Sequence, residues 1–341
     1  MKPVPVQNAI GMVLCHDITR IVPGEFKGPA FRKGQVIQAG DIPRLLEIGK
    51  EHVFACELAE GSVHEDDAAV RIARAAAGQG LTLTDPVEGK VNLVASRAGL
   101  LKVSVASLLR LNAIEDVMFA TLHNNRPVGS GTAVAGTRVI PLAVGEETVA
   151  AAEAVCGGDF PLIQIKPFAA RRIGIVTTGS EVYHGRIQDR FGPVLHVKFA
   201  ELGSQVMRQV FVSDDVDMTV NAIHALLADG AEFIALTGGM SVDPDDQTPA
   251  SIRAAGGRVV TYGAPVLPGA MFMLAYLDDV PVVGLPGCVM YYRTSIFDLT
   301  VPRIMAGERL TREDIIAMGH GGFCSGCETC RYPNCGFGKG V

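Results

Sequence analysis

The stretch from Arg171 to about Gly307 constrains the fold most, because short apolar runs alternate there with amphipathic runs that end in glycine. Strands alternating with helices predict an α/β class, with a mostly parallel sheet covered by helices on both faces in three layers. Ligands of such sheets bind beyond the carboxyl ends of the strands. The strand patterns cover 172–178, 205–212, 231–239, 258–263, 272–277 and 281–287, and the helix patterns cover 193–203, 216–230, 246–257 and 291–307.

The rest of the chain predicts smaller units around this domain. A chain of 341 residues commonly forms two or three domains. We expect a small α+β lobe over 1–80, with a short helix near Pro43, and a β-rich lobe over 81–170 that includes a helix in "EETVAAAEAVC". The α/β domain then occupies 171–310, and a cysteine-rich tail follows over 311–341.

Composition excludes several classes of function. The chain is 48% hydrophobic and 19% charged, which argues against disorder. Its net charge of -6 and scattered basic residues give no footprint for nucleic acid. The N-terminus lacks the apolar run of a signal peptide, and no stretch reaches ~18 apolar residues. We therefore expect a cytoplasmic protein without a membrane span.

The first motif at a strand end is "TTGSE". Thr178, Gly179 and Ser180 follow an apolar strand, and Glu181 adds a carboxylate. Glycine lets a backbone approach a ligand closely, while hydroxyl and N–H groups can donate to phosphate oxygens. The alternative is an ordinary turn between a strand and a helix.

The second motif, "TGGMSVDPDD", joins a tight turn to an acidic one. It contains two glycines, a hydroxyl and three carboxylates, namely Gly238, Gly239, Ser241, Asp243, Asp245 and Asp246. One aspartate could simply cap the helix that begins near Thr248. Three carboxylates this close favour a cation, and Mg²⁺ prefers one or two carboxylates plus phosphate oxygens. An exposed acidic turn is the alternative.

Two further strand ends carry candidate groups. Asp214 and Asp215 follow the strand at 205–212, and Asp215 is expected to cap the next helix, which leaves Asp214 free for a ligand. Pro286, Gly287 and Cys288 follow the last strand, with the cysteine near a helix N-terminus, where a thiolate is stabilised. A small buried residue in a turn is the alternative for Cys288.

The C-terminal tail contains four clustered cysteines, Cys324, Cys327, Cys330 and Cys335. Their spacing is Cys-x2-Cys-x2-Cys-x4-Cys, and thiolates at two-residue gaps can surround one metal centre. The first three resemble a ferredoxin run, but the last gap is one residue longer, so zinc and an iron–sulfur cluster both stay open. A flexible reactive tail or adventitious disulfides are the alternatives.

Together, these motifs make 171–307 resemble the molybdopterin-binding domain of molybdopterin molybdenumtransferases and related adenylyltransferases. Thr178, Gly179 and Glu181 fall on its Thr-Gly-x-Glu element, and Asp214-Asp215 fall on its paired aspartates. The remaining matches lie on its Gly-Gly-x-Ser element, the aspartate that ends it and its Pro-Gly turn, at Gly238, Gly239, Ser241, Asp246, Pro286 and Gly287.

The resemblance implies molybdenum cofactor biosynthesis, with insertion of molybdate into adenylylated molybdopterin and release of AMP. Mg²⁺ would bind at Asp243, Asp245 or Asp246, and catalytic roles would fall to Asp243, Asp246, Asp214 and Glu181. Members commonly self-associate, so we expect a homodimer, and a molybdenum enzyme is a possible partner. No nucleic acid or membrane partner is expected.

Departures from the family pattern keep two other functions open. Cys288-Val289 replaces the Asn-Pro that usually follows Pro-Gly, and "DPDD" is closer to competence-damage-inducible proteins, which hydrolyse nucleotide pyrophosphates. The N-terminal half lacks the Ser-Ala-x-Asp-Gly-Tyr-Ala signature of the transferases. A nucleotide pyrophosphatase and a non-catalytic cofactor carrier are therefore the alternatives.

Overall fold

The computed structural model describes residues 3–54, 60–158 and 161–340. Contacts within the chain divide it into two units. The first holds Met1–Ser96, Val103–Leu122 and Ser130–Gln164, and the second holds Arg97–Lys102, His123–Gly129 and Ile165–Val341.

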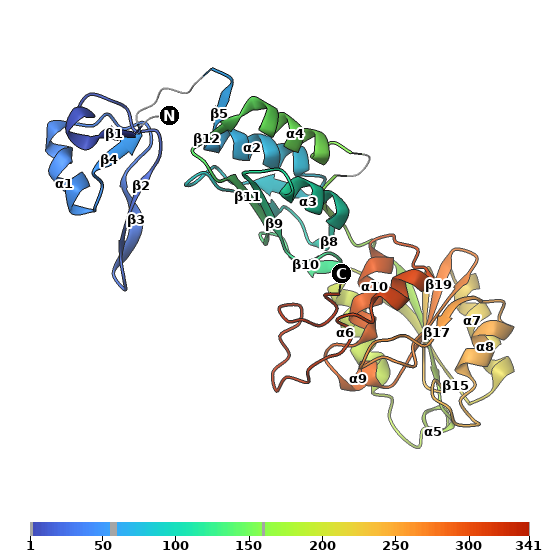
Figure 1. Cartoon of the computed structure of the whole chain (residues 1–341). Coiled ribbons are helices and arrows are strands. Elements are labelled where there is room, and N and C mark those ends of the chain that lie inside the picture. Colours follow the sequence, from blue (N-terminus) through green and yellow to red (C-terminus); the bar gives the residue numbers. More distant parts are fainter. Residues whose placement is uncertain (1–2, 55–59, 159–160, 341) are drawn as a thin grey trace. The chain divides into compact units, whose positions relative to one another are not determined.

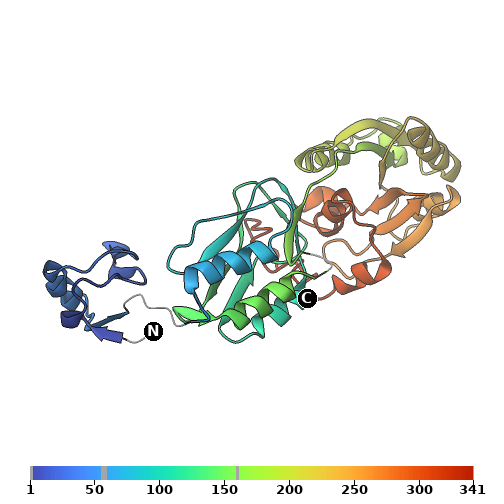
Figure 2. The ribbon, with the colours of Figure 1, turned by 90° about the horizontal axis from the view of Figure 1, so that it is seen from above.

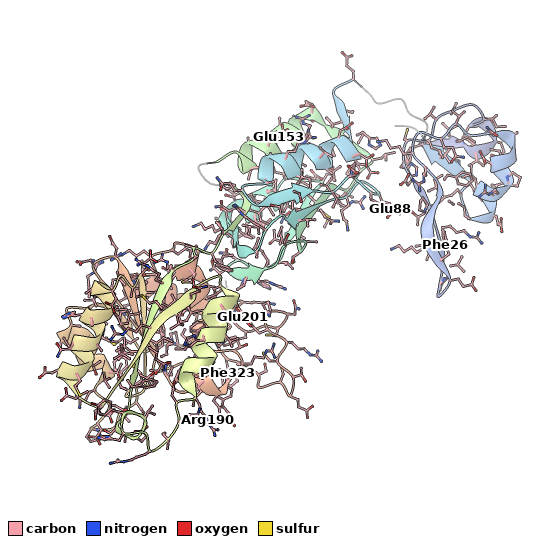
Figure 3. The ribbon with its side chains drawn as sticks, turned by 180° about the vertical axis from the view of Figure 1, so that it is seen from behind. Phe26, Glu88, Glu153, Arg190, Glu201 and Phe323 are labelled. Carbon is pink, nitrogen blue, oxygen red and sulfur yellow. The ribbon has the colours of Figure 1, made fainter. Side chains whose placement is uncertain are left out.

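The first unit begins with a small α+β part that carries its own core. Strands β1 (Pro3–Pro5) and β4 (His52–Phe54) pair antiparallel, and β2 (Ile18–Val22) pairs with β3 (Phe26–Phe31) in a hairpin that carries Phe26 (Figure 3). The helices are η1 (Val6–Asn8), η2 (Ala39–Asp41) and α1 (Ile42–Glu47). The helix predicted near Pro43 is thereby confirmed. The buried side chains include Val6, Leu14, Ile18, Phe31, Ile37, Leu45 and Val53.

Two helices cover a four-stranded sheet in the remainder of the first unit. Helices α2 (Glu65–Ala76) and α4 (Glu146–Cys156) lie side by side, blue and green in Figure 2. The sheet order is β6-β7-β11-β9, and a second pair joins β5 to β12. The bounds are β5 Ser62–His64, β6 Leu81–Leu83, β7 Val91–Ala95, α3 Val105–Asn112, β9 Val117–Thr121, β11 Ala133–Val139 and β12 Ala143–Gly145.

The structure differs from the predicted β-rich pattern of 81–170 in one place. Helix α3 lies within that range, because Leu108 and Leu111, three residues apart, share a helical face. Helix α2 buries Ile72 and Ala76 and packs on β7 and β11. The predicted helix "EETVAAAEAVC" matches α4. The four segment boundaries stay predictions.

The second unit contains a six-stranded sheet in the order β15-β14-β16-β19-β18-β17. Strands β15, β14, β16 and β19 are parallel, and β18 is antiparallel to both of its neighbours. The predicted mostly parallel α/β class is confirmed. The strands are β14 Arg172–Thr178, β15 Gln205–Val212, β16 Phe233–Thr237, β17 Arg258–Tyr262, β18 Met273–Leu277 and β19 Val280–Leu285. A smaller sheet joins β8 (Gly99–Val103), β10 (Arg126–Val128) and β13 (Ile163–Lys166).

Helices cover both faces of the large sheet, α6 and α10 on one side and α7 and α8 on the other (Figure 1). Along β16, Phe233 and Ala235 belong to the buried cluster under α6 and α10, while Ile234 and Leu236 belong to the buried cluster under α7 and α8. Successive side chains of a strand point to opposite faces, so a strand buried on both faces reads as a continuous apolar run. The helices are α5 Ser180–Tyr183, α6 Phe191–Glu201, α7 Val216–Ala228, α8 Thr248–Ala254, α9 Cys288–Tyr291, α10 Ile296–Met305 and α11 Arg312–Ala317.

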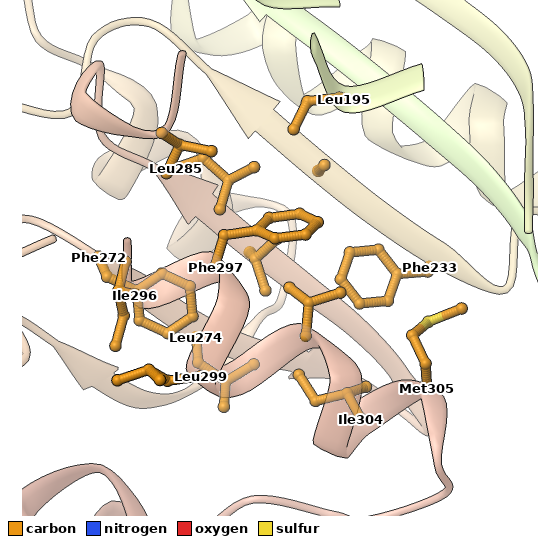
Figure 4. Close-up of a cluster of buried hydrophobic side chains, with 14 of the residues drawn as sticks. Leu195, Phe233, Phe272, Leu274, Leu285, Ile296, Phe297, Leu299, Ile304 and Met305 are labelled. Atoms are coloured by element: carbon orange, nitrogen blue, oxygen red, sulfur yellow. The ribbon is translucent and has the colours of Figure 1, made fainter. Parts of the chain in front are cut away.

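Aromatic contacts anchor α6 and α10 to the sheet. The ring of Phe199 lies 5.3 Å from that of Phe233 and 5.4 Å from that of Phe297, in both cases edge to face. Figure 4 shows Phe297 among buried side chains of α10 and the sheet, with Phe233 nearby. Such pairs contribute about 0.5–1.5 kcal/mol each beyond their burial.

The predicted helix over 291–307 is wrong at its start. Helix α10 begins at Ile296 because Ser295 and Asp298 form a capping box, in which Ser295 N donates to Asp298 Oδ2 at 2.8 Å. The short helix α9 precedes it. No helix in the described ranges is long and apolar enough to cross a membrane.

A partly buried ion-pair network in the second unit links the strand β8 to the C-terminal end of α10 and to α11. Glu308 accepts from Lys102 Nζ at 2.6 Å and from Arg303 Nε at 2.7 Å, and Arg303 also pairs with Asp314 at 2.6 Å. Burial acts to raise the pKa of Glu308, but the hydrogen bonds from Lys102 and Arg303 outweigh it, and the pKa is lowered. The folded state therefore favours the ionised carboxylate.

Replacing Glu308 by Gln should lower the free energy of unfolding at pH 7 by roughly 2 to 3 kcal/mol, because Lys102 and Arg303 each lose a carboxylate in a site with limited solvent access, where Arg303 keeps only Asp314. The wild-type advantage exists above the ordinary glutamate pKa and disappears as the pH falls through the lowered folded pKa. Urea unfolding at pH 7 and in acid measures both effects. Asp229→Asn, which removes an exposed pair with Arg208, is the control and should change stability by less than about 1 kcal/mol. An equal loss in both variants would contradict the prediction.

Candidate functional site

The carboxyl ends of four parallel strands meet at one edge of the large sheet. Thr178 of β14 pairs with Val212 of β15, and Thr237 of β16 pairs with Leu285 of β19. The loops that follow these strands therefore start side by side. Helices α5 and α9, which come directly after two of them, lie at the same lower edge in Figure 1. The four sequence motifs start together at this edge.

Asp214 connects the loop after β15 to the "TTGSE" motif. Its Oδ2 accepts a hydrogen bond from Ser180 N at 2.8 Å, and the hydroxyls of Ser180 and Ser213 lie 2.9 Å apart. Gly179 has a φ of 139°, a backbone conformation that residues with a side chain rarely adopt. Asp214 thus holds the "TTGSE" turn in place, whereas Glu181 is exposed and available at the rim.

Asp215 has the predicted capping role. Its Oδ1 accepts from Met218 N at 2.7 Å at the start of α7. The prediction that this residue caps the helix is confirmed. Only Asp214 of the pair therefore faces the first motif.

The two glycines of the second motif bring its backbone against the first motif. Gly238 and Gly239 have φ values of 84° and 56°. A Cβ on Gly238 would lie 2.2 Å from Thr178 O, and one on Gly239 would lie 2.9 Å from Thr248 Oγ1. Thr248 Oγ1 also donates to Gly238 O at 2.8 Å. The turn therefore requires glycine for both its conformation and its close packing.

The three aspartates of the acidic turn have different roles. Asp246 Oδ2 accepts from Asp243 N at 3.0 Å, and Asp246 N donates to Asp243 O at 2.9 Å, so Asp246 stabilises the turn itself. Helix α8 has no side-chain cap, so capping does not explain any of them. Ser241, Asp243 and Asp245 are exposed, and both of these carboxylates are free of hydrogen bonds and ion pairs within the described ranges.

Tyr262 was missed by the sequence analysis. Its hydroxyl lies 3.2 Å from Met240 O and 3.3 Å from Ser241 O, so it supports the glycine turn from the far end of β17. The guanidinium of Arg253 lies 5.8 Å from the centre of its ring. An aromatic residue at the end of a strand is too common a signal to identify this contact, which only the folded sheet creates.

Cys288 differs from the expectation of a stabilised thiolate. Burial raises the pKa of its thiol, and the backbone N–H groups of Cys288 and Val289 oppose this only partly. Pro286 and Gly287 place it at the start of the four-residue helix α9, which is too short to offset the burial. The raised pKa keeps the thiol protonated at neutral pH. This agrees with the alternative, in which Cys288 is a small buried residue in a turn.

The described part of the chain contains no group of three or more His, Cys, Asp or Glu side chains that could hold one metal ion. Cys324, Cys327, Cys330 and Cys335 are thus not arranged as a four-thiolate centre, and Cys330 Sγ lies instead 3.2 Å from Thr294 Oγ1. The tail metal stays a prediction from spacing. A magnesium ion that shares one or two carboxylates with a phosphate needs no such group, and the free carboxylates of Asp243 and Asp245 fit that requirement.

The tail nevertheless packs against the rest of the second unit. Phe337 is 4% exposed within the core cluster of the large sheet. Tyr332 donates its hydroxyl to Asp298 O at 3.0 Å, and burial raises the pKa of this phenol. The cysteines therefore lie on a segment packed against α10.

Comparison with known proteins gives two family matches. Residues 174–306 match the profile of a probable molybdopterin binding domain, and residues 3–57 match a domain of unknown function (DUF8806). Residues 55–57 lie outside the described ranges.

Individual relatives cover only part of the chain. It is 36% identical over 87 residues to a CinA-like protein of Mycobacterium sp. (strain MCS), covering 26% of this chain and 21% of the relative. It is 27% identical over 122 residues to a molybdopterin molybdenumtransferase of Bacillus subtilis (strain 168), covering 34% of this chain and 28% of the relative. The chain thus matches less than a third of either relative's length.

Among solved structures, the tungsten cofactor synthesizing protein MoaB of Pyrococcus furiosus aligns with a TM-score of 0.34 and 18% identity, covering 41% of this chain and 98% of that one. The family match spans the sheet and all four motifs of the strand-end site. Over residues 174–306, the chain therefore carries a domain of the probable molybdopterin-binding family.

Proposed function

We propose that this protein acts in molybdenum cofactor biosynthesis and inserts molybdate into adenylylated molybdopterin, with release of AMP. The family match over 174–306 and the partial similarity to a molybdopterin molybdenumtransferase support a role in that process. The cradle at the strand ends, made of the loops after β14, β15, β16 and β19, would bind the pyrophosphate of the substrate.

One observation carries the proposal, namely the turn Gly238–Ser241. The amide N–H groups of Gly239, Met240 and Ser241 donate no hydrogen bond to any described residue. Unpaired donors need an acceptor when a ligand covers them. Successive backbone N–H groups in a turn form concave sites for anions such as phosphate. The hydroxyls of Ser180 and Ser213 bond to each other, which leaves one of their two O–H groups as a further donor on the neighbouring loops.

The chain's own residues would bind and orient the substrate. The glycine turn would hold the phosphates, and Tyr262 would keep that turn in position. Asp243 and Asp245 would bind Mg²⁺ together with phosphate oxygens, which would offset negative charge on the pyrophosphate when the ion is bound. Asp214 would fix the first loop, and the exposed Glu181 would orient the cation or a water.

A nucleotide pyrophosphatase is the second candidate. The sequence "DPDD" resembles that of competence-damage-inducible proteins, and CinA-like proteins are among the relatives. This reaction would use the same cradle, but water would attack the pyrophosphate and molybdate would not be needed. A carrier that binds the cofactor without catalysis is the third.

Purified protein should release AMP from adenylylated molybdopterin with Mg²⁺ only when molybdate is added, measured by chromatography of the nucleotide. Asp243→Asn combined with Asp245→Asn should slow release at least tenfold, because the cation loses both free carboxylates. Asp217→Asn, on the exposed start of α7, is the control and should keep the wild-type rate. Release without molybdate would favour the pyrophosphatase, and tight binding without release would favour the carrier.

Gly239→Ala should weaken binding of inorganic pyrophosphate at least tenfold, measured by titration calorimetry in Mg²⁺. The added Cβ would press on Thr248 Oγ1 at 2.9 Å and on Thr178 Oγ1 at 3.2 Å, which displaces the turn. Gly203→Ala is the matched control, because its φ of 73° carries similar strain but its Cβ would contact nothing within 4 Å. Equal binding by both variants would show that the glycine turn is not the phosphate site.

A further inference from the structure

A groove that none of the motifs predicts adjoins the strand-end site. It has a volume of about 1030 Å³ and runs between α6 on one side and residues 290–302 on the other. Tyr332 and Pro333 of the tail form part of its wall, and all of its lining residues belong to the second unit. Its size is at the upper end of the range of small-molecule sites.

One end of the groove lies close to the cradle. Met290, Tyr291 and Tyr292 line it, only three to five residues after Gly287 of the fourth motif. Tyr291 is 81% exposed and Tyr292 is 50% exposed, and their ring centres are 5.1 Å apart. Neither phenol has a hydrogen-bond partner among the described residues. Exposed aromatic side chains gathered in a groove are typical of a surface that stacks on a ligand.

The charges at this end favour an anion. Asp298 is neutralised, because its carboxylate accepts from Lys198 Nζ at 2.7 Å and from Ser295 N at 2.8 Å. Arg293 lines the same end, and its guanidinium makes no hydrogen bond or ion pair with any described residue. Glu201, the last residue of α6 (Figure 3), also lines the groove, one helical turn beyond Lys198.

We propose that the aromatic end of the groove binds a purine nucleoside monophosphate, which is the nucleotide half of the substrate. The rings of Tyr291 and Tyr292 stand at 76° to each other, so the purine would stack on the face of one ring and contact the other at an angle. Arg293 would pair with the phosphate. A guanidinium binds phosphate in a two-pronged fashion, and every base has a π-face for stacking. This assignment rests on the proposed function, because it places the nucleotide next to the pyrophosphate cradle.

Titration calorimetry with AMP and, separately, inorganic pyrophosphate tests the assignment. The double variant Tyr291→Ala, Tyr292→Ala should bind AMP at least tenfold more weakly and pyrophosphate as well as the wild type does. Arg293→Gln should lower AMP affinity about fivefold to tenfold. Tyr291→Phe, Tyr292→Phe should retain binding, because the rings remain.

Phe323→Ala is the control, since it removes a ring that is 74% exposed on the tail but does not line the groove. If the alanine variant fails to fold, Arg293→Gln and the phenylalanine variant still decide the question. Absent AMP binding by the wild type, or equal binding by wild type and Arg293→Gln, would overturn the groove assignment. Retained pyrophosphate binding in that case would leave the cradle, and with it the proposed function, intact.

Sedimentation velocity separates a ligand site from an interface between copies of this chain. The wild type and the double alanine variant should sediment alike. Loss of self-association in the variant alone would identify the tyrosines as an interface and overturn the proposal.

Discussion

The strand-end site depends on one steric constraint, the direct contact between the loops after β14 and β16. A Cβ on Gly238 would stand 2.2 Å from the carbonyl oxygen of Thr178, so no other residue allows the two backbones to approach this closely. The parallel register of β14 and β16 fixes where these loops begin. Since the contact uses backbone and small hydroxyl groups, it leaves the N–H groups of the glycine turn free. A ligand that offers acceptors can therefore occupy a position that no side chain of the protein fills.

Around this contact, the acidic residues divide between structure and chemistry. Asp214, Asp215 and Asp246 each accept a backbone N–H group and hold a turn or a helix start. Asp243 and Asp245 make no such bond and are exposed. Three carboxylates in a short acidic turn thus do not form one cation cage. They supply one structural group and two free ones, which is the number that Mg²⁺ uses when phosphate oxygens complete its coordination.

The sheet was predictable because both of its faces are buried, and a strand such as β16 then appears in the sequence as an unbroken apolar run. The motif residues were predictable because they follow those runs directly. The start of α10 was not, because its capping box at Ser295 overrides an apolar pattern that begins earlier. Tyr262 was missed for a similar reason: its contact with Met240 crosses from one edge of the sheet to its middle, and no local pattern encodes it.

The sequence by itself determined the class of the domain and the positions of its glycines and carboxylates, because the period of apolar residues and the conformational freedom of glycine are local properties. Only the tertiary structure decided which aspartates are free, how burial raises the pKa of Cys288, and that Tyr291, Tyr292 and Arg293 share one end of a groove. Hydrogen bonding, burial and concavity arise between segments far apart in the chain, so they become defined only when the helices and strands pack together.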